Sequence, residues 1–392
     1  MRTQSTKEVS TVFRAVLPRL STLNLSPDKQ RVVRSIVACR TAELGGHISS
    51  CSACGYAEQS YNSCWNRHCP KCQGGAAFNW TEKRLSELLP VPYFHVVFTL
   101  PKELRPLCYA NKKEFYNLFF KASSETLLQV GLNNEKVHLG LFAVLHTWNQ
   151  DLEYHPHLHY LVPAGGITET GSWQTFTKGK RFFLPVRILS QVFCGKLVAL
   201  IKKAYTKKKF YLKANLSHLQ NPREFESLIS KATKKDWVVY AKRPFAGPET
   251  VVKYLSNYTH RVAISNHRIR KVTPQTVSFS ARHRTKKGKK RLVTLPTETF
   301  VRRFLLHTLP RGFRRIRYFG YLSNDKRTEA IKRLQKELNF TPLIPAPSPT
   351  SICPECTKPS FSRVALLKPH RIQPIAPTLT QKTIPLCLSP PN

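Results

Sequence analysis

The 392-residue sequence is poor in acidic residues and has no long apolar run. Asp and Glu number 22 against 63 Lys and Arg, which gives a formal net charge of +41. Self-repulsion at this level destabilises a compact chain, so an ordinary metabolic enzyme is excluded and nucleic acid is the expected partner. Without a run of about 18 apolar residues, a transmembrane helix is excluded and no membrane partner is expected. The first ten residues lack the apolar segment of a secretory signal, so we expect a cytoplasmic chain.

Two catalytic signatures are also missing. There is no G-x-x-x-x-G-K-[ST] phosphate loop, so no ATP requirement is expected, and no H-E-x-x-H motif, so the helix-borne zinc site of metalloproteases is not indicated. Apolar residues nevertheless make up 41% of the chain, with 22 Phe and 14 Tyr. This is enough for a folded core and excludes global disorder.

Composition divides the chain into three regions. We expect a helical and zinc-binding domain over residues 1–90, a catalytic α+β domain over 91–340, and a mostly disordered tail over 341–392 that holds 12 of the 28 Pro residues. Hydrophobic periodicity predicts strands at 94–100, 138–148, 156–163 and 237–240, and helices at 109–132, 185–212, 247–260 and 325–338.

Five of the eleven cysteines crowd between residues 51 and 72, in the pattern C-x2-C-x9-C-x4-C-x2-C. Two C-x-x-C knuckles can turn four thiolates toward one ion, so we predict a structural Zn²⁺ bound by Cys51, Cys54, Cys69 and Cys72. The segment is too poor in apolar residues to fold without metal. Cys64, His68 and His47 stay open as replacement ligands or as ligands of a second ion.

A further C-x-x-C pair, Cys353 and Cys356, lies in the tail. It is half of a metal site, because Cys387 is distant in sequence and His370 is the only tail histidine. We expect this pair to be solvated and without metal; the alternative is a second zinc site.

The run Tyr154-His155-Pro-His157-Leu-His159 predicts a metal site on a strand. Side chains alternate faces along a strand, so His157 and His159 point the same way, about 6–7 Å apart, and can chelate one ion. A third ligand is expected from Gln150, with Asp151 and Glu153 as alternatives. Imidazoles favour Zn or Mn and oxygen ligands favour Mg, so the residue types leave the ion open.

Tyr254 and Tyr258 stand four residues apart in the predicted helix 247–260 and share one face. A phenol with a pKa of about 10 is a weak nucleophile unless it is activated. A metal on the phosphate, with Lys253 and Arg261 nearby, would activate it. The spacing alone is better explained by packing, and only the combination with the histidines and the positive charge favours a pair of nucleophiles.

Basic residues interleaved with aromatics suit single-stranded nucleic acid, because cations track the backbone while rings stack on bases. Each run taken singly is also explained as a solvated face. The expected DNA contacts are Arg67, Lys71, Lys253, Arg261, Arg284, Lys286, Lys287, Lys289, Lys290, Arg314, Arg315 and Arg317.

Six motifs occur in a fixed order: Asn62-Ser-Cys-Trp-Asn-Arg-His-Cys-Pro-Lys-Cys-Gln73, Phe94-His-Val-Val-Phe-Thr-Leu-Pro101, Leu145-His-Thr-Trp148, the histidine run, Tyr254-x3-Tyr258 and Arg314-Arg-Ile-Arg-Tyr-Phe-Gly-Tyr321. Over about residues 15–340 the chain therefore resembles rolling-circle transposases of bacterial insertion sequences, the two-tyrosine HUH group of insertion-sequence-91 type. HUH denotes two histidines that flank a hydrophobic residue. The chain departs from these relatives at Thr357, where they often have Gly after Cys-Pro-x-Cys.

The resemblance implies a zinc-binding domain followed by an HUH nuclease domain, an antiparallel sheet with helices on its face. It implies Mg²⁺ or Mn²⁺ on His157 and His159 and nucleophiles at Tyr254 and Tyr258. The implied function is a DNA transposase that nicks and rejoins single-stranded DNA through 5′-phosphotyrosine intermediates, associated with the nucleoid when bound to DNA. The alternatives are an HUH replication initiator or relaxase, and a non-catalytic zinc protein that binds nucleic acid. No particular oligomeric state is predicted.

Overall fold

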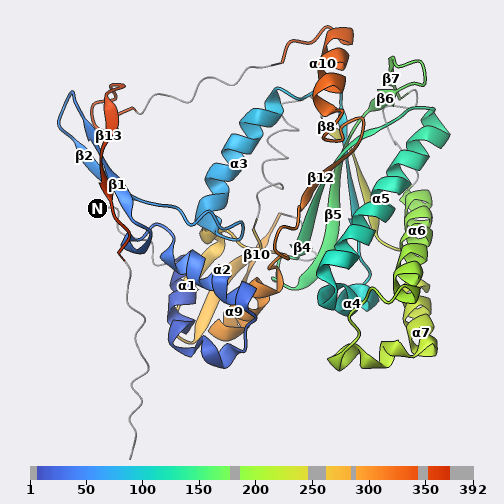
Figure 1. Cartoon of the computed structure of the whole chain (residues 1–392), viewed down its shortest axis with the longest axis horizontal. Helices are drawn as coiled ribbons and strands as arrows, with labels where there is room; N and C mark the ends of the chain where they lie inside the picture. Colours follow the sequence, from blue (N-terminus) through green and yellow to red (C-terminus); the bar gives the residue numbers. More distant parts are fainter. Residues whose placement is uncertain (1–6, 177–185, 246–261, 284–287, 343–351, 371–392) are drawn as a thin grey trace, which may run out of the picture. The chain divides into compact units, whose positions relative to one another are not determined.

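The computed structural model describes residues 7–176, 186–245, 262–283, 288–342 and 352–370 (Figure 1). The chain forms two compact units, Met1–Cys39 with Ser63–Pro349, and Arg40–Asn62 with Thr350–Asn392. It therefore leaves the first unit after Cys39 and returns to it at Ser63. In the part of the chain that the structure describes, no helix combines the length and the apolar character needed to cross a membrane.

A five-stranded sheet forms the centre of the first unit. Its order is β12-β4-β5-β3-β8, and every neighbouring pair is antiparallel. The α+β fold with an antiparallel sheet is therefore confirmed, and the predicted histidine strand, β5, is its middle strand. The strands span Tyr93–Thr99 (β3), Gly140–Trp148 (β4), Tyr154–Pro163 (β5), Val239–Phe245 (β8) and Ile316–Gly320 (β12).

Helices cover one face of this sheet, and α5 and α6 lie side by side on it (Figure 1). Alternate apolar side chains on the strands, such as Phe98 and Leu158, pack against Phe119 of α5 and Phe193 of α6 in the largest hydrophobic core. Strand alternation explains why these positions turn one way and their neighbours turn the other. The helices on this side are α4 (Arg105–Ala110), α5 (Lys112–Glu135), α6 (Val186–Thr206) and α7 (Pro222–Thr233).

The opposite face of the sheet is divided between apolar and polar residues. At one end Phe142 and Leu161 pack against Leu334 of α10 (Arg327–Glu337), with Trp80 of α3 (Pro70–Leu85) at the margin. The other end carries histidines from three adjacent strands. The sheet that carries the histidines therefore has a hydrophobic core on each of its two faces.

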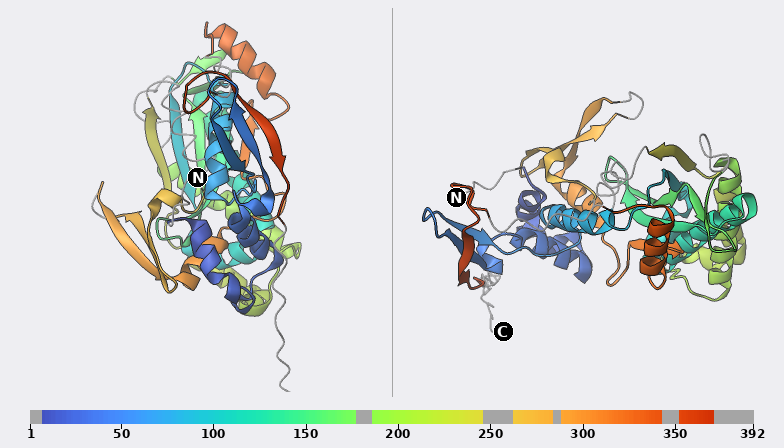
Figure 2. Two further views of the ribbon diagram at one scale, coloured as in Figure 1. Left: turned by 90° about the vertical axis from the view of Figure 1, so that its left-hand side faces the viewer. Right: turned by 90° about the horizontal axis from the view of Figure 1, so that it is seen from above.

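A second core in the same unit joins the N-terminal helices to a smaller sheet of order β11-β10-β9. Phe13 of α1 meets Phe304 of α9 edge-on, with ring centroids 5.2 Å apart. The β10–β11 hairpin extends away from this core (Figure 2). The elements are α1 (Val9–Val16), α2 (Pro27–Ala38), β9 (Ile269–Val272), β10 (Thr276–Arg282), β11 (Lys290–Pro296) and α9 (Thr297–Leu306), with the short pair β6 (Gly165–Ile167) and β7 (Trp173–Thr175) elsewhere in the unit.

The second unit is an antiparallel sheet of order β13-β1-β2, formed by β1 (Gly46–Cys51), β2 (Ala57–Tyr61) and β13 (Phe361–Leu367). Figure 2 shows β13 alongside β1. The expectation of a mostly disordered tail does not hold for residues 352–370, because their prolines flank β13 rather than interrupt it. The division also differs from the three predicted regions, since residues 40–62 separate from the rest of 1–90.

Candidate metal centres and active site

Three histidines on adjacent strands bring their ring nitrogens together on the face of the sheet opposite α5. His157 and His159 share one face of β5, as their spacing predicts, and the β4–β5 pairing sets His146 directly opposite His157. The ring centroids lie 4.5 to 5.5 Å apart. One nitrogen from each ring lies within 4.8 Å of the other two. Three imidazoles at this separation fit chelation of one divalent ion.

Hydrogen bonds orient two of these rings. Nδ1 of His157 donates to the backbone carbonyl of His155 at 2.7 Å, which leaves Nε2 as the nitrogen that carries the lone pair. Nδ1 of His159 lies 2.9 Å from Nε2 of His95 on β3, and the two rings stack at 7°. A proton on Nδ1 of His159 would make Nε2 the ligating atom there too. His95 is thus a supporting residue that the sequence analysis did not single out.

His155 lies on the same face but is directed to a different partner. Its Nδ1 accepts a hydrogen bond from the Arg105 guanidinium at 2.7 Å. Burial, together with the charge of Arg105, lowers the pKa of His155 to about 4, so this imidazole is neutral at physiological pH. The three-residue cluster of His146, His157 and His159 therefore does not include it.

The third imidazole comes from His146, which the sequence analysis does not name as a ligand, and Gln150 stays a prediction. Gln150 lies in the β4–β5 turn, where its backbone carbonyl accepts a hydrogen bond from Arg268 at 2.7 Å. His146 reaches the cluster because antiparallel pairing places it across from His157. A regular hairpin extended from the pair Trp148–Tyr154 would set His146 opposite Pro156. An irregularity between His146 and Trp148 shifts the register by one residue, to His157, and the spacing of the sequence does not show it.

The alternative ligands, Asp151 and Glu153, are used to hold that turn. The Asp151 carboxylate forms an ion pair with Arg291. The Glu153 carboxylate accepts a hydrogen bond from the Asn149 side chain at 2.8 Å, and the Asn149 side-chain oxygen accepts from the backbone N–H of both acidic residues. These contacts fix the turn and leave the metal cluster to the histidines.

The predicted nucleophiles lie outside the described residues. Tyr254, Tyr258, Lys253 and Arg261 all fall within 246–261. Their assignment therefore stays a prediction.

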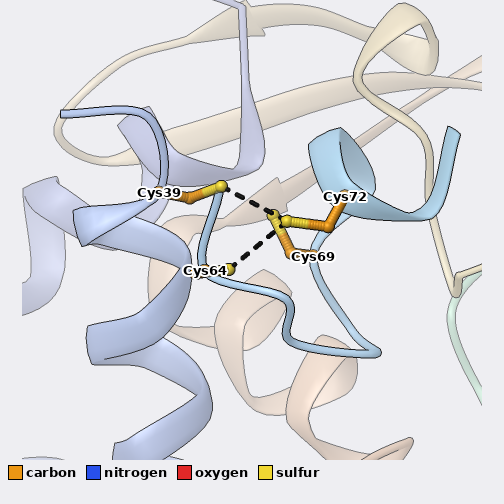
Figure 3. A group of neighbouring side chains, drawn as sticks. All are labelled: Cys39, Cys64, Cys69 and Cys72. Carbon is orange, nitrogen blue, oxygen red and sulfur yellow. Dashed lines mark hydrogen bonds between the residues drawn. The ribbon is translucent and has the colours of Figure 1, made fainter. Parts of the chain in front are cut away.

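The thiols of four cysteines in the first unit lie close together, with all four sulfurs within 4.8 Å of one another (Figure 3). Cys39 directly follows α2, and Cys64 lies between β2 and α3. Cys69 is the N-cap residue of α3, and Cys72 lies in the first turn of that helix. Sγ of Cys72 lies 3.5 Å from that of Cys39 and 3.6 Å from that of Cys64. A Zn–S bond of about 2.3 Å implies S–S separations of about 3.8 Å in a tetrahedron. The cluster therefore has the dimensions of a Cys₄ zinc site.

The electrostatics of this cluster agree with metal ligation. Hydrogen bonds from Cys64 and Cys69 lower the pKa of Cys39, whereas the proximity of Cys39 raises the pKa of Cys64 to about 12. The N-terminus of α3 adds a positive end of a helix dipole beside Cys69 and Cys72. Without a metal, ionisation of one thiol therefore disfavours ionisation of its neighbours. A bound cation would allow all four to be thiolates.

The predicted zinc set of Cys51, Cys54, Cys69 and Cys72 is wrong in its grouping. The structure brings Cys69 and Cys72 to Cys39 and Cys64, and it brings Cys51 and Cys54 to Cys353 and Cys356 of the tail. The physical reason is that residues 40–62 leave the first unit and form a hairpin of the second. Nearness in sequence was the wrong criterion for these ligands.

The two histidines left open as zinc ligands stand outside both cysteine groups. The half-buried His68 accepts a hydrogen bond at Nε2 from the backbone N–H of Leu309, 3.2 Å away. Desolvation lowers the pKa of His68 to about 3, so the ring is neutral. His47 lies within β1, between its partners on β2 and β13.

Several of the expected DNA contacts form ion pairs or hydrogen bonds within the protein, and their contact with DNA stays a prediction. Lys71 pairs with Glu8 at 2.7 Å. Arg315 donates to Gln73, and burial lowers the pKa of Arg315 to about 10. Arg317 donates to Asn117 and stacks over Phe120 with its guanidinium carbon 4.3 Å from the ring centroid. Arg314, Lys289 and Lys290 are exposed, and Arg284, Lys286 and Lys287 lie outside the described residues.

The cysteine segment is hydrogen-bonded to the chain that enters β12. Arg67 donates to the backbone carbonyl of Phe313, and Arg315 donates to Gln73 at 2.9 Å. β12 then pairs with β4, the strand of His146. The first cysteine cluster therefore supports the edge of the sheet that carries the histidines.

This contact predicts a stability effect for Arg67. Arg67→Ala removes a charged donor from a partly buried carbonyl and is expected to lower the free energy of unfolding by about 1.5–3 kcal/mol. Urea unfolding followed by circular dichroism measures it. The matched control is Arg31→Ala, which removes an exposed ion pair with Asp28 and should cost less than about 0.5 kcal/mol. Equal losses in both variants would contradict the supporting role.

Comparisons with known families give two matches that follow one another along the chain. Residues 12–100 match the model described as "Transposase zinc-binding domain" (Zn_Tnp_IS91). Residues 140–329 match the model described as "Putative transposase" (Y2_Tnp). The first match includes six of the clustered cysteines, and the second includes His146, His157 and His159.

Two curated relatives extend over most of the chain. The "Putative transposase y4qJ" of Sinorhizobium fredii (strain NBRC 101917 / NGR234) is 42% identical over 352 residues, which cover 88% of this chain and 87% of the relative. The "Transposase for insertion sequence element IS801" of Pseudomonas savastanoi pv. phaseolicola is 26% identical over 323 residues, which cover 81% and 75%. A solved structure of the conjugative relaxase TrwC in complex with oriT DNA is 14% identical, covers 63% of this chain and 73% of its own, and has a TM-score of 0.23.

Proposed function

Because this chain belongs to the insertion-sequence transposase family, of the IS91 type, we propose that it cleaves and rejoins single-stranded DNA at element ends during rolling-circle transposition. One observation carries the proposal: three histidines meet on adjacent antiparallel strands, with one nitrogen of each within 4.8 Å of the others. This donor set fits a divalent ion, for which we propose Mg²⁺ or Mn²⁺. Bound there, the ion would polarise a non-bridging oxygen of the scissile phosphate and offset the negative charge of the transition state.

The histidines themselves contribute orientation. Hydrogen bonds on Nδ1 of His157 and His159 hold the two rings with Nε2 toward the cluster. Imidazole ligands, unlike carboxylates, add no negative charge beside a phosphate, so the site stays attractive to the DNA backbone. The pKa of His155 is lowered, which keeps that ring neutral and leaves Arg105 as the local cation.

Tyr254 and Tyr258 are proposed as the nucleophiles. A phenol oxygen attacks the phosphorus in line, a 5′-phosphotyrosine bond forms, and the 3′ oxygen leaves as a hydroxyl. The energy of the phosphodiester is retained in the covalent link, so rejoining needs no ATP. The second tyrosine cleaves another strand while the first is still loaded, and each free 3′-hydroxyl then attacks a phosphotyrosine to restore a phosphodiester.

A basic groove of about 520 Å³ along β12 is a candidate path for the strand. Exposed cations on its wall are Lys113, Arg311 and Arg314. The aromatic residues Tyr318 and Phe319 also line it, and the Arg327 guanidinium already lies 4.4 Å from the Tyr318 ring centroid. Charge that follows the backbone and a ring that stacks on a base are the two elements of single-strand binding. Arg317 lines the same groove but is committed to Asn117 and Phe120.

This electrostatic binding predicts steep salt dependence. Affinity for single strands falls by about 0.7 of a log unit per log unit of salt for each phosphate contact, so six contacts give about a 300-fold loss between 50 and 200 mM salt. Fluorescence anisotropy with a labelled oligonucleotide measures it. An affinity that barely changes over this range would contradict a binding surface made of Lys and Arg.

The function is tested with end-labelled single-stranded DNA that carries an element end. We expect a covalent protein–DNA adduct that requires Mg²⁺ or Mn²⁺, is abolished by EDTA, and maps by mass spectrometry to a tyrosine peptide. A zinc protein that only binds nucleic acid would give no adduct. A replication initiator or relaxase would give an adduct but would not join the element end to a target strand.

A further inference from the structure

The second cysteine group joins two parts of the chain that are remote in sequence. Cys51 and Cys54 come from the end of β1 and its turn, and Cys353 and Cys356 come from the turn before β13. Sγ of Cys51 lies 3.6 Å from that of Cys356, and Sγ of Cys54 lies 3.7 Å from that of Cys353. All four sulfurs lie within 4.8 Å of one another. A disulfide would need about 2.05 Å, whereas a tetrahedral Zn–S₄ site needs about 3.8 Å.

The first of the two turns has the backbone of a metal-binding knuckle. The N–H of Cys51 donates to the carbonyl of Tyr56 at 2.8 Å, five residues on. The N–H of Gly55 donates back to the carbonyl of Cys51 at 3.0 Å, and Gly55 has a φ of 73°. The positive φ turns the chain directly after the second cysteine, so that both thiols point to one side.

The second turn repeats this geometry bond for bond. The N–H of Cys353 donates to the carbonyl of Lys358 at 2.9 Å, again five residues on. The N–H of Thr357 donates to the carbonyl of Cys353 at 2.9 Å, and Thr357 has a φ of 58°. A β-branched residue is unfavourable at positive φ, so Thr357 holds the conformation that Gly55 holds in the first turn at a cost that something must offset.

Hydrogen bonds outside the two turns keep the sulfurs in register. β1 and β13 pair from Gly46 with Leu367 to Cys51 with Phe361. The hydroxyl of Ser360 lies 3.0 Å from Sγ of Cys51 and can donate to a thiolate there. In metal sites, residues around the ligands commonly orient them by hydrogen bonds of this kind.

This unit has almost no core other than the cysteines. Among its described residues, the side chains that are buried are those of Cys51 and Cys353, at 2% and 0% exposure. Val364 and Leu366 of β13 remain exposed. A small three-stranded sheet without a hydrophobic core needs another source of folding free energy, and a structural metal is the usual one.

We propose that Cys51, Cys54, Cys353 and Cys356 bind a second structural Zn²⁺, which ties the C-terminal strand to the N-terminal hairpin. The chain then carries two Cys₄ zinc ions, and each site takes its ligands from within a single compact unit. Binding replaces the thiol protons by the metal, so the protons are released to solvent on loading. The proposal does not depend on nicking activity.

Zinc stoichiometry of the full-length protein tests this proposal. We expect two zinc ions per chain by inductively coupled plasma and native mass spectrometry, and one in Cys353→Ala/Cys356→Ala. The matched control is Cys194→Ala, a partly exposed cysteine of α6 outside both groups, which should keep two. Mass spectra after thiol alkylation should show Cys353 and Cys356 protected in the native protein and labelled after chelation.

A conservative variant keeps the test decisive if the double variant fails to fold. Thr357→Gly suits the positive φ, so it should keep both ions and slow chelator-driven release of the second ion by about two- to fivefold. One zinc ion in the well-folded wild-type protein, or alkylation of Cys353 and Cys356 at the rate of Cys194, would overturn the proposal. Loss of DNA nicking with two zinc ions still bound would count against the proposed function and not against this site.

Discussion

Replacing His146 with alanine is expected to lower the rate of DNA nicking at least about 100-fold, although the sequence motif of the site contains only His157 and His159. Outer-shell changes alone cost 10- to 100-fold in metal sites, and His146 supplies one of three nitrogens that meet within 4.8 Å. The loss should be partly reversed by raising the Mn²⁺ concentration, because the variant binds the ion more weakly. Single-turnover nicking at several Mn²⁺ concentrations measures both effects.

The matched control is His138→Ala. His138 is an exposed histidine just before β4 whose backbone pairs with Ile167, so its ring is available for removal without loss of that pairing. We expect unchanged nicking there. Thermal unfolding of the His146 variant separates metal loss from misfolding, since the ring also stacks on Trp148 at 4.6 Å. A His146 variant that folds and nicks at the wild-type rate would show that two histidines suffice.

Changing both Tyr254 and Tyr258 to phenylalanine is expected to abolish the covalent DNA adduct, a loss of at least about 10⁴-fold. Phenylalanine keeps the ring and removes only the attacking oxygen, so the effect reports chemistry rather than packing. Each single change should leave an adduct on the remaining tyrosine but impair transposition, because two strands have to be cleaved. Denaturing gels of protein bound to labelled DNA and a mating-out assay measure the two outcomes.

Tyr211→Phe serves as the control for this pair. Tyr211 is 59% exposed and lies on the segment after α6, outside the predicted tyrosine helix. Its loss should change neither the adduct nor transposition. An undiminished adduct in the double variant would place the nucleophile elsewhere, and the DNA-linked peptide would identify it.

The histidine site shows which information a single sequence carries. Strand alternation is local, so the shared face of His157 and His159 follows from their spacing. The third ligand depends on which residue of the neighbouring strand lies opposite, and that needs the hairpin register. A short polar turn between the two β-runs indicates a hairpin, but the irregularity between His146 and Trp148 shifts the register by one residue. The sequence alone therefore does not place His146 opposite His157.

The cysteines show the opposite case. Paired C-x-x-C spacing correctly indicated metal, but four of the eight clustered cysteines find their partners across chain separations that no spacing rule covers. Cys39 precedes the C-x-x-C block and belongs to no C-x-x-C pair, so its spacing gives no sign that it joins Cys64, Cys69 and Cys72. The cysteines can be grouped correctly only when the path of the chain is known, because it leaves the first unit after Cys39 and re-enters it at Ser63.

The basic residues show a related limit of the sequence. A sequence gives the charge of Arg315 and Arg317 but not the acceptors that fold against them, namely Gln73 and Asn117. Net charge remains a valid argument for a polyanionic partner, since it does not depend on where each cation points. The choice of individual contacts does depend on it.

The pairing of β1 with β13 sets a delay during protein synthesis. Cys51 and Cys356 are 305 residues apart, and ribosomes add about 5–20 residues per second, so the N-terminal hairpin waits roughly 15 to 60 s for its third strand. Through that interval one edge of β1 stays unpaired, with reduced thiols beside it, open to wrong partners and to oxidation. A nascent transposase is thus most vulnerable at the hairpin that is made first and completed last.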